Sequence, residues 1–286
     1  MSVARVAISL PTQTRGYASN RFLLAGGFLL ASLAIIAVLA PWIAPHDPGT
    51  VEVRRVLGAP DLLHPLGSDV LGRDVLSRVI YGLRVSLLVS VSAVAASLAV
   101  AVPLGLAAGY FGRWVDTAVS RSLDMILIFP AMLLAVTFVA ILGPGSLIAA
   151  TAIAVIYLPI LARVMRTSTL VVGQHEYVAG ARARGASHLR VLTTHVAPNA
   201  LGPVIVQASV LSAFALQLEA GLSFLGLGTQ PPTPSLGGML ADGRDVLTQA
   251  PWVEVFPGLA IVVAVLAFAF LGEGLRRFFD PLGVTE

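Results

Sequence analysis

One carboxyl group lies where charge is costly. Glu219 is the acidic residue of an otherwise apolar run at 203–227, and a charge deep in hydrocarbon costs roughly 3 kcal/mol on insertion scales. Such a group usually faces the interior of a helix bundle or a water-filled path. Two roles stay open. Glu219 meets an amino group on such a path, or it is a protonated or hydrogen-bonded carboxyl that locks two helices together.

The other reactive side chains do not form the pattern of an enzyme. A catalytic site inside a membrane needs convergent groups at one depth, such as paired carboxylates or His-x3-His, whereas all the histidines fall in polar segments: His46, His64, His175, His188 and His195. The chain has no cysteine for thiol chemistry or metal binding. It also has no lysine, so it lacks the phosphate-binding pattern Gly-x4-Gly-Lys-Ser/Thr. We expect no catalytic residue, no metal ligand and no bound cofactor in this chain.

The polar segment at 174–199 has the pattern of two short helices. The first covers about 175–184, Gly185-Ala186-Ser187 breaks it, and the second runs from His188 to about Val196 and should end at Pro198. Gly185 supplies the backbone freedom of a sharp turn, and Ser187 is suited to cap the second helix. The segment is either a helix–turn–helix held at the membrane surface or an interfacial loop whose arginines meet lipid phosphates.

Long apolar blocks must position these polar groups. The composition is 57% hydrophobic and 12% charged, and a membrane span needs roughly 20 apolar residues. Blocks that meet or approach this length lie at 22–44, 85–111, 118–142, 147–165, 203–227 and 255–275. The sequence therefore predicts an all-α integral membrane protein with about six transmembrane helices in one membrane domain.

The arginines indicate the orientation of these spans. We interpret the first block as an uncleaved anchor, because it is longer than the apolar region of a signal peptide. A cytoplasmic N-terminus places most arginines inside. It gives cytoplasmic tails at 1–21 and 278–286, extracytoplasmic segments at 45–84 and 229–254, and a core at 85–277. Topology also explains the basic composition better than nucleic-acid binding does.

Two further patterns concern packing. Small residues recur every four positions in the second block and predict a close helix contact on one face: Ala93, Ser97, Ala101, Gly105 and Gly109. We favour a partner helix in the same subunit over one in a second subunit. Pro130 and Pro159 lie inside predicted spans and mark expected bends, because each removes a backbone hydrogen bond.

The polar segment resembles the cytoplasmic signature of binding-protein-dependent ABC importer permeases. That signature reads Glu-Ala-Ala, three residues, Gly, nine residues, then Ile-x-Leu-Pro, and it aligns here on Gly185 and Pro198 without a gap. Ala181 also matches, whereas Ala179 stands at the position of the glutamate. Glu176 precedes that position by less than one turn and would present a carboxylate on a neighbouring part of the same helix face.

Three other regions resemble the dipeptide/oligopeptide/nickel permeases within that class. They are HPLGSDVLGRDVLSR at 64–78, EAGLSFLGLG with the following QPP at 219–232, and the set APW at 250–252, FPG at 256–258 and GEGLRR at 272–277. Together these motifs cover the chain from about residue 44 to residue 281.

The resemblance implies a type I importer permease of MetI-like architecture in the bacterial cytoplasmic membrane. Implied partners are a second homologous permease, two ATPase subunits that hold ATP and magnesium, an extracytoplasmic peptide-binding protein and membrane lipid. It implies that the ATPases contact Glu176, Ala179, Ala181, Gly185, Ala186, Ser187 and Pro198. Peptides are the favoured substrate, with nickel or another small solute as the alternative. An ion-coupled transporter would be favoured by inverted repeats, which we do not see.

Overall fold

The computed structural model describes residues 15–279, and these residues form helices joined by turns and loops. The long helices are α1 (Arg15–Val38), α3 (Val75–Phe111), α6 (Ser146–Gly173), α9 (Ala197–Phe224) and α11 (Trp252–Phe279). The shorter ones are α2 (Ala40–Ile43), α4 (Arg113–Leu127), α5 (Ala131–Leu142), α7 (Glu176–Ala183), α8 (His188–Val191) and α10 (Leu236–Arg244). A 3-10 turn covers Val53–Arg55, and a π-helical turn covers Leu192–Val196. The all-α prediction is confirmed.

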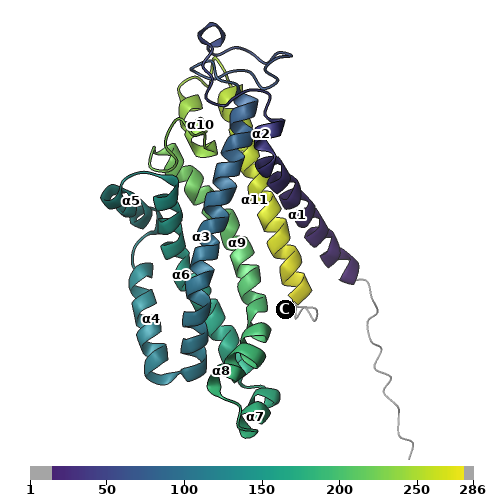
Figure 1. The fold of residues 1–286 in the computed structure, drawn as a ribbon, viewed down its shortest axis with the longest axis vertical. Coiled ribbons are helices and arrows are strands. Elements are labelled where there is room, and N and C mark those ends of the chain that lie inside the picture. The colour runs from purple at the N-terminus through teal and green to yellow at the C-terminus, as the bar shows by residue number, and fades with distance from the viewer. Residues whose placement is uncertain (1–14, 280–286) are drawn as a thin grey trace, which may run out of the picture.

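The long helices run along one axis of an elongated bundle (Figure 1). Helices α3, α6 and α9 form its centre, α1 lies against α11 on one side, and α4 and α5 lie on the other. One tip, which we name the loop end, carries the segment 44–74 and α10. The opposite tip, the α7–α8 end, carries those two short helices. The predicted tails at 1–14 and 280–286 lie outside the described residues.

The number of spans agrees with the sequence, but the third one is not straight. Among the described residues, five helices are long and apolar enough to cross a membrane, or six if α4 and α5 count as one bent span. The bend expected at Pro130 is present, since α4 and α5 meet at an angle of 85°. Pro130 causes the break: it has no N–H to donate and disfavours helical geometry at the residue before it. At Pro159, by contrast, α6 continues without interruption.

The small residues of α3 pack against α6 of the same subunit, as predicted. Ala93, Ser97 and Ala101 are buried. A Cβ atom added to Gly105 would lie 2.6 Å from the Ala162 carbonyl oxygen, and one added to Gly109 would lie 2.7 Å from the Arg166 carbonyl oxygen. The backbones of the two helices therefore approach closely along this face.

Two helices extend beyond their apolar blocks. Helix α3 begins at Val75, ahead of the apolar block, because Asp74 caps it by accepting a hydrogen bond from the Ser77 N–H. Helix α6 continues past Met165 to Gly173. Arg166 in this extension binds both carboxylate oxygens of Asp116, at 2.5 and 2.6 Å, and so fastens α4 to α6.

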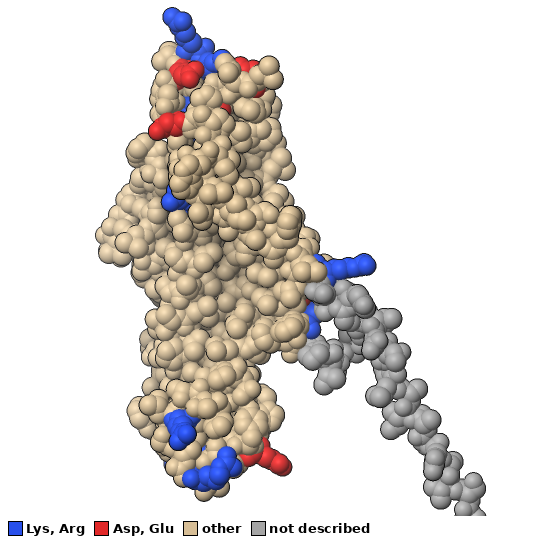
Figure 2. Space-filling model, turned by 45° about the vertical axis from the view of Figure 1, so that its right-hand side comes forward, with Lys and Arg blue, Asp and Glu red and all other residues tan. Residues whose placement is uncertain are grey.

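Charged side chains are concentrated away from the middle of the bundle. On the face in Figure 2 they gather at the two tips and near the chain ends, and a broad, largely uncharged surface lies between. Large apolar side chains cover much of this middle zone, for example Phe28, Leu88 and Leu133, each more than half exposed. Such a surface suits hydrocarbon rather than water.

Candidate functional site

The α7–α8 end is built around Gly185. Its φ of +79° lies in the left-handed region, where glycine is strongly preferred. The Gly185 N–H donates to the Arg182 carbonyl at 2.9 Å, and the Ala186 N–H donates to the Ala181 carbonyl at 3.2 Å. This pair of bonds is a Schellman motif that ends α7. Ser187 then starts α8 by accepting a hydrogen bond from the Arg190 N–H at 3.4 Å. The predicted turn and cap are both present.

The predicted end of the second short helix at Pro198 is wrong. The chain continues from α8 through the π-helical turn directly into α9, and Pro198 lies in the first turn of α9. A proline, which has no N–H to donate, fits there because the π-helical turn directly before it departs from regular α-helical bonding. The Asn199 side-chain amide also donates to the His195 carbonyl at 2.7 Å and thereby supports the irregular turn. Segment α8 is therefore the first part of a long helix that passes into the bundle.

The residues predicted to contact ATPase subunits divide into surface and interior positions. Exposed side chains or backbone are found at Glu176, Ala179, Gly185, Ser187 and Pro198. Ala186 is half-buried, and Ala181 is buried. Because Ala181 packs against the bundle with Val178, it positions α7 rather than offering a contact surface.

Tyr110 links this turn to the end of α3. Its hydroxyl lies 2.9 Å from His188 Nδ1 on α8, and the Arg182 guanidinium of α7 stacks 4.7 Å above its ring. Tyr110 therefore joins both short helices to the end of α3. Sequence patterns did not identify this contact, because the residues lie far apart in the chain.

Glu219 lies in the interior of the subunit. Its side chain is 0% exposed, and the Ser223 hydroxyl donates to Glu219 Oε1 at 2.8 Å. The Ser86 hydroxyl of α3 lies beside the same carboxyl, outside hydrogen-bonding geometry. Glu219 of α9 therefore packs beside Ser86 of α3 in the interior of the bundle, which is compatible with a structural role for the carboxyl.

A groove lies elsewhere, between α6, α9 and α11 near the α7–α8 end. It encloses about 960 Å³ and has polar lining groups that include Arg163, Asn199, Gln207 and Arg276. Glu219 does not line it. The sequence pattern did not single out these four residues.

Comparison with protein families identifies two regions of this chain. Residues 101–282 match the binding-protein-dependent transport system inner membrane component. Residues 15–65 match the N-terminal TM domain of oligopeptide transport permease C.

Curated relatives align over most of their length. The dipeptide transport system permease protein DppC of Alkalihalophilus pseudofirmus is 40% identical and aligns over 92% of this chain and 86% of its own. The di/tripeptide transport system permease protein DppC of Pseudomonas aeruginosa is 41% identical and aligns over 93% of this chain and 90% of its own. The glutathione transport system permease protein GsiD of Pectobacterium atrosepticum is 38% identical and aligns over 93% of this chain and 89% of its own.

Solved structures share the fold. A chain of the MetNI methionine ABC transporter, in inward-facing conformations, superposes with a TM-score of 0.58 at 18% identity and covers 73% of this chain and 97% of its own. A chain of an amino acid ABC transporter superposes with a TM-score of 0.55 at 16% identity and covers 72% of this chain and 95% of its own. The expected type I importer architecture is therefore present. Together with the family matches, this shows that the chain belongs to the binding-protein-dependent transport system inner membrane components and is a permease subunit of an ABC importer.

Proposed function

We propose that this permease imports di- and oligopeptides and that ATP hydrolysis on partner subunits drives it. The substrate class follows the names of its relatives, which are dipeptide, di/tripeptide and glutathione permeases. A second permease completes the pore, two ATPases bind ATP and magnesium, and an extracytoplasmic binding protein delivers the peptide.

The orientation we propose has both termini and the α7–α8 end in the cytoplasm. Arg182, Arg184 and Arg190 are exposed at that end, which agrees with the preference for positive charge inside. At the loop end, Arg55, Arg73, Arg78 and Arg244 are instead paired with acids. Arg73 Nε lies 2.6 Å from Asp69 Oδ2 and Arg78 Nε lies 3.2 Å from the same oxygen. Because acids neutralise these arginines, their positive charge is compatible with an extracytoplasmic location.

The turn at Gly185 is the main structural support for a coupling between the ATPase subunits and the membrane spans. It presents α7 and α8 at the tip of the bundle, and α8 continues through the π-helical turn into α9. A rigid connection of this kind transmits motion of a docked ATPase to the spans, so that nucleotide binding shifts the permeases between two access states.

Substitution of Gly185 tests this proposal. Gly185→Val places a β-branched residue at a positive φ, which costs on the order of 1 to 3 kcal/mol and misdirects α8. We expect the subunit to insert and pair with the second permease, but to lose ATPase capture in pull-downs and substrate-stimulated hydrolysis in liposomes. Gly173→Ala is the matched control, because a Cβ atom there meets no atom within 4 Å. Normal docking and hydrolysis in Gly185→Val would place the coupling surface elsewhere.

The substrate requires a separate measurement. The complete complex with its binding protein, in proteoliposomes, should accumulate labelled dialanine or glutathione only when ATP is available to the ATPases. Ni²⁺ accumulation without peptide accumulation would replace the substrate assignment. Peptide uptake driven by a proton or sodium gradient without ATP would contradict the transport mechanism.

A further inference from the structure

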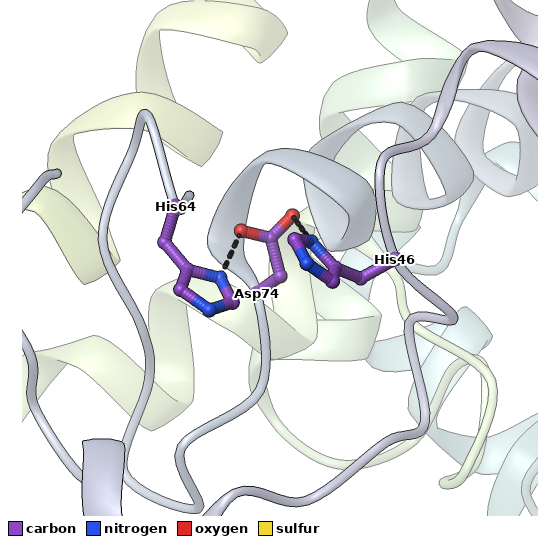
Figure 3. Close-up of side chains that lie close together, drawn as sticks. All are labelled: His46, His64 and Asp74. Carbon is purple, nitrogen blue, oxygen red and sulfur yellow. Dashed lines mark hydrogen bonds and ion pairs between the residues drawn. The ribbon is translucent and has the colours of Figure 1, made fainter. Parts of the chain in front are cut away.

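Three side chains at the loop end converge on one point (Figure 3). His64 Nδ1 lies 2.9 Å from Asp74 Oδ1, and His46 Nδ1 lies 3.9 Å from Asp74 Oδ2. The two imidazole rings stack with their centroids 4.5 Å apart and their planes 23° apart. Potential ligand atoms from all three residues lie within 4.8 Å of one another. Both rings therefore present a nitrogen to the same carboxylate.

One of these nitrogens lacks a hydrogen bond. His46 Nδ1 is buried and has no hydrogen-bond partner among the described residues, although a buried polar atom without a partner is destabilising. An imidazole nitrogen without a hydrogen-bond partner is available to bind a metal ion.

Neighbouring groups hold the three side chains in place. The Ser77 N–H donates to Asp74 Oδ2 at 2.8 Å, and the His46 N–H donates to the Ser77 hydroxyl at 3.0 Å. On the opposite side of the His64 ring, Nε2 lies 4.0 Å from Glu52 Oε2. Metal-binding histidines commonly direct their second ring nitrogen toward a carboxylate, and metal-binding carboxylates accept further hydrogen bonds.

We propose that His46, His64 and Asp74 bind a divalent transition-metal ion of the Zn²⁺ type. Two imidazoles and a carboxylate are typical ligands of a four-coordinate zinc ion that keeps one position for water. Metal–ligand bonds of about 2.0–2.2 Å require ligand atoms roughly 3–4 Å apart, close to the separations found here. The His46 side chain is 33% exposed, which gives the ion access from solvent.

The bound ion joins three separate parts of the loop end. His46 follows α2, His64 lies within the loop, and Asp74 caps α3. A cation at this position fastens the loop to the first turn of α3 and supplies the partner that His46 Nδ1 lacks.

Zinc content of the intact complex tests the site. The complex, purified without a polyhistidine tag, is stripped with EDTA, mixed with ZnCl₂ and desalted, and its metal content is measured by mass spectrometry. We expect one zinc ion for each copy of this chain. Competition with a chromophoric zinc chelator should show affinity at least about 100-fold lower for His46→Asn and His64→Asn, because loss of a ligand should exceed the 10–100-fold cost of losing an outer-shell group.

His175→Asn is the control, since His175 is exposed at the opposite tip, and it should bind zinc like the wild type. His46 Nδ1 makes no hydrogen bond among the described residues, so His46→Asn should fold and assemble. Zinc should raise the unfolding midpoint of the wild type and leave that of His46→Asn unchanged. Absence of zinc from the reloaded wild type, or equal affinity in wild type and His46→Asn, would leave a hydrogen-bonded His–Asp cluster and overturn the proposal.

Discussion

Glu219 shows how a carboxyl group is accommodated in an apolar bundle. It is fully buried, and its Oε1 accepts a hydrogen bond from the Ser223 hydroxyl, one turn later on α9. A carboxyl that faced a passage for solutes in this conformation would show some exposed surface. Packing between α9 and α3 is therefore the role that the geometry favours.

Substitutions at Glu219 distinguish that role from direct contact with substrate. Glu219→Gln keeps the shape and an acceptor for Ser223, so we expect ATP-driven uptake in proteoliposomes to stay within about twofold of wild type. Glu219→Leu removes the acceptor and should lower the free energy of unfolding by about 1–3 kcal/mol, measured by thermal unfolding in detergent.

Ser223→Ala provides the control, because it removes the donor of the same bond. If the Ser223–Glu219 hydrogen bond is the main contribution of Glu219 to stability, the double variant Ser223→Ala/Glu219→Leu should be little less stable than either single variant. Loss of uptake in Glu219→Gln, with the complex assembled normally, would instead assign Glu219 to the transport path.

At the scale of elements, the contact between α3 and α6 determines the spacing of the bundle centre. Gly105 brings the two backbones together, since an added Cβ atom would lie 2.6 Å from both the Ala162 carbonyl oxygen and Met165 Cβ. Backbone atoms cannot move aside without displacing a whole helix. Position 105 therefore accommodates a smaller side chain than its apolar surroundings alone indicate.

Gly105→Ala should separate α3 from α6. We expect a loss of about 1–3 kcal/mol, the usual cost of overpacking a dense interior, seen as a lower midpoint of thermal unfolding. Gly27→Ala on α1 is the matched control, because a Cβ atom there meets no atom within 4 Å. Equal midpoints for the two variants would show that α3 and α6 are not held this closely.

At the scale of the whole molecule, the two tips differ in how their charges are neutralised. In the loop end, buried Asp69 binds Arg73 and Arg78, and both arginines also approach Asp242 near the end of α10. The network holds the loop, α3 and α10 together. In the α7–α8 end the arginines of the turn are exposed, so that tip keeps its positive charge.

Single cysteines test the orientation that this asymmetry favours. The chain has no native cysteine, and Ala59, Thr248 and Ala179 are exposed. In intact cells, an impermeant maleimide should label Ala59→Cys and Thr248→Cys but not Ala179→Cys. Ala179→Cys should react after the membrane is permeabilised, which controls for its reactivity. Labelling at 179 with none at 59 in intact cells would reverse the topology.

The sequence alone determined the features that depend on local chain chemistry. Apolar length located the spans, because hydrocarbon admits long helices whose backbone groups are bonded internally. The four-residue repeat containing Gly105 indicated a close helix contact, and Gly185 followed by Ser187 marked a turn and a cap. These features follow from backbone geometry within a few residues, so their residues suffice to specify them.

Tertiary structure decided the features that depend on distant partners. Pro130 marked a bend, but packing set its angle of 85°. Pro198 appeared to stop a helix, and the π-helical turn instead carried the chain into α9. His46, His64 and Asp74 have no metal-binding spacing in the sequence. They meet because the loop folds back onto the first turn of α3. Residues that are far apart in the sequence thereby lie close together in space.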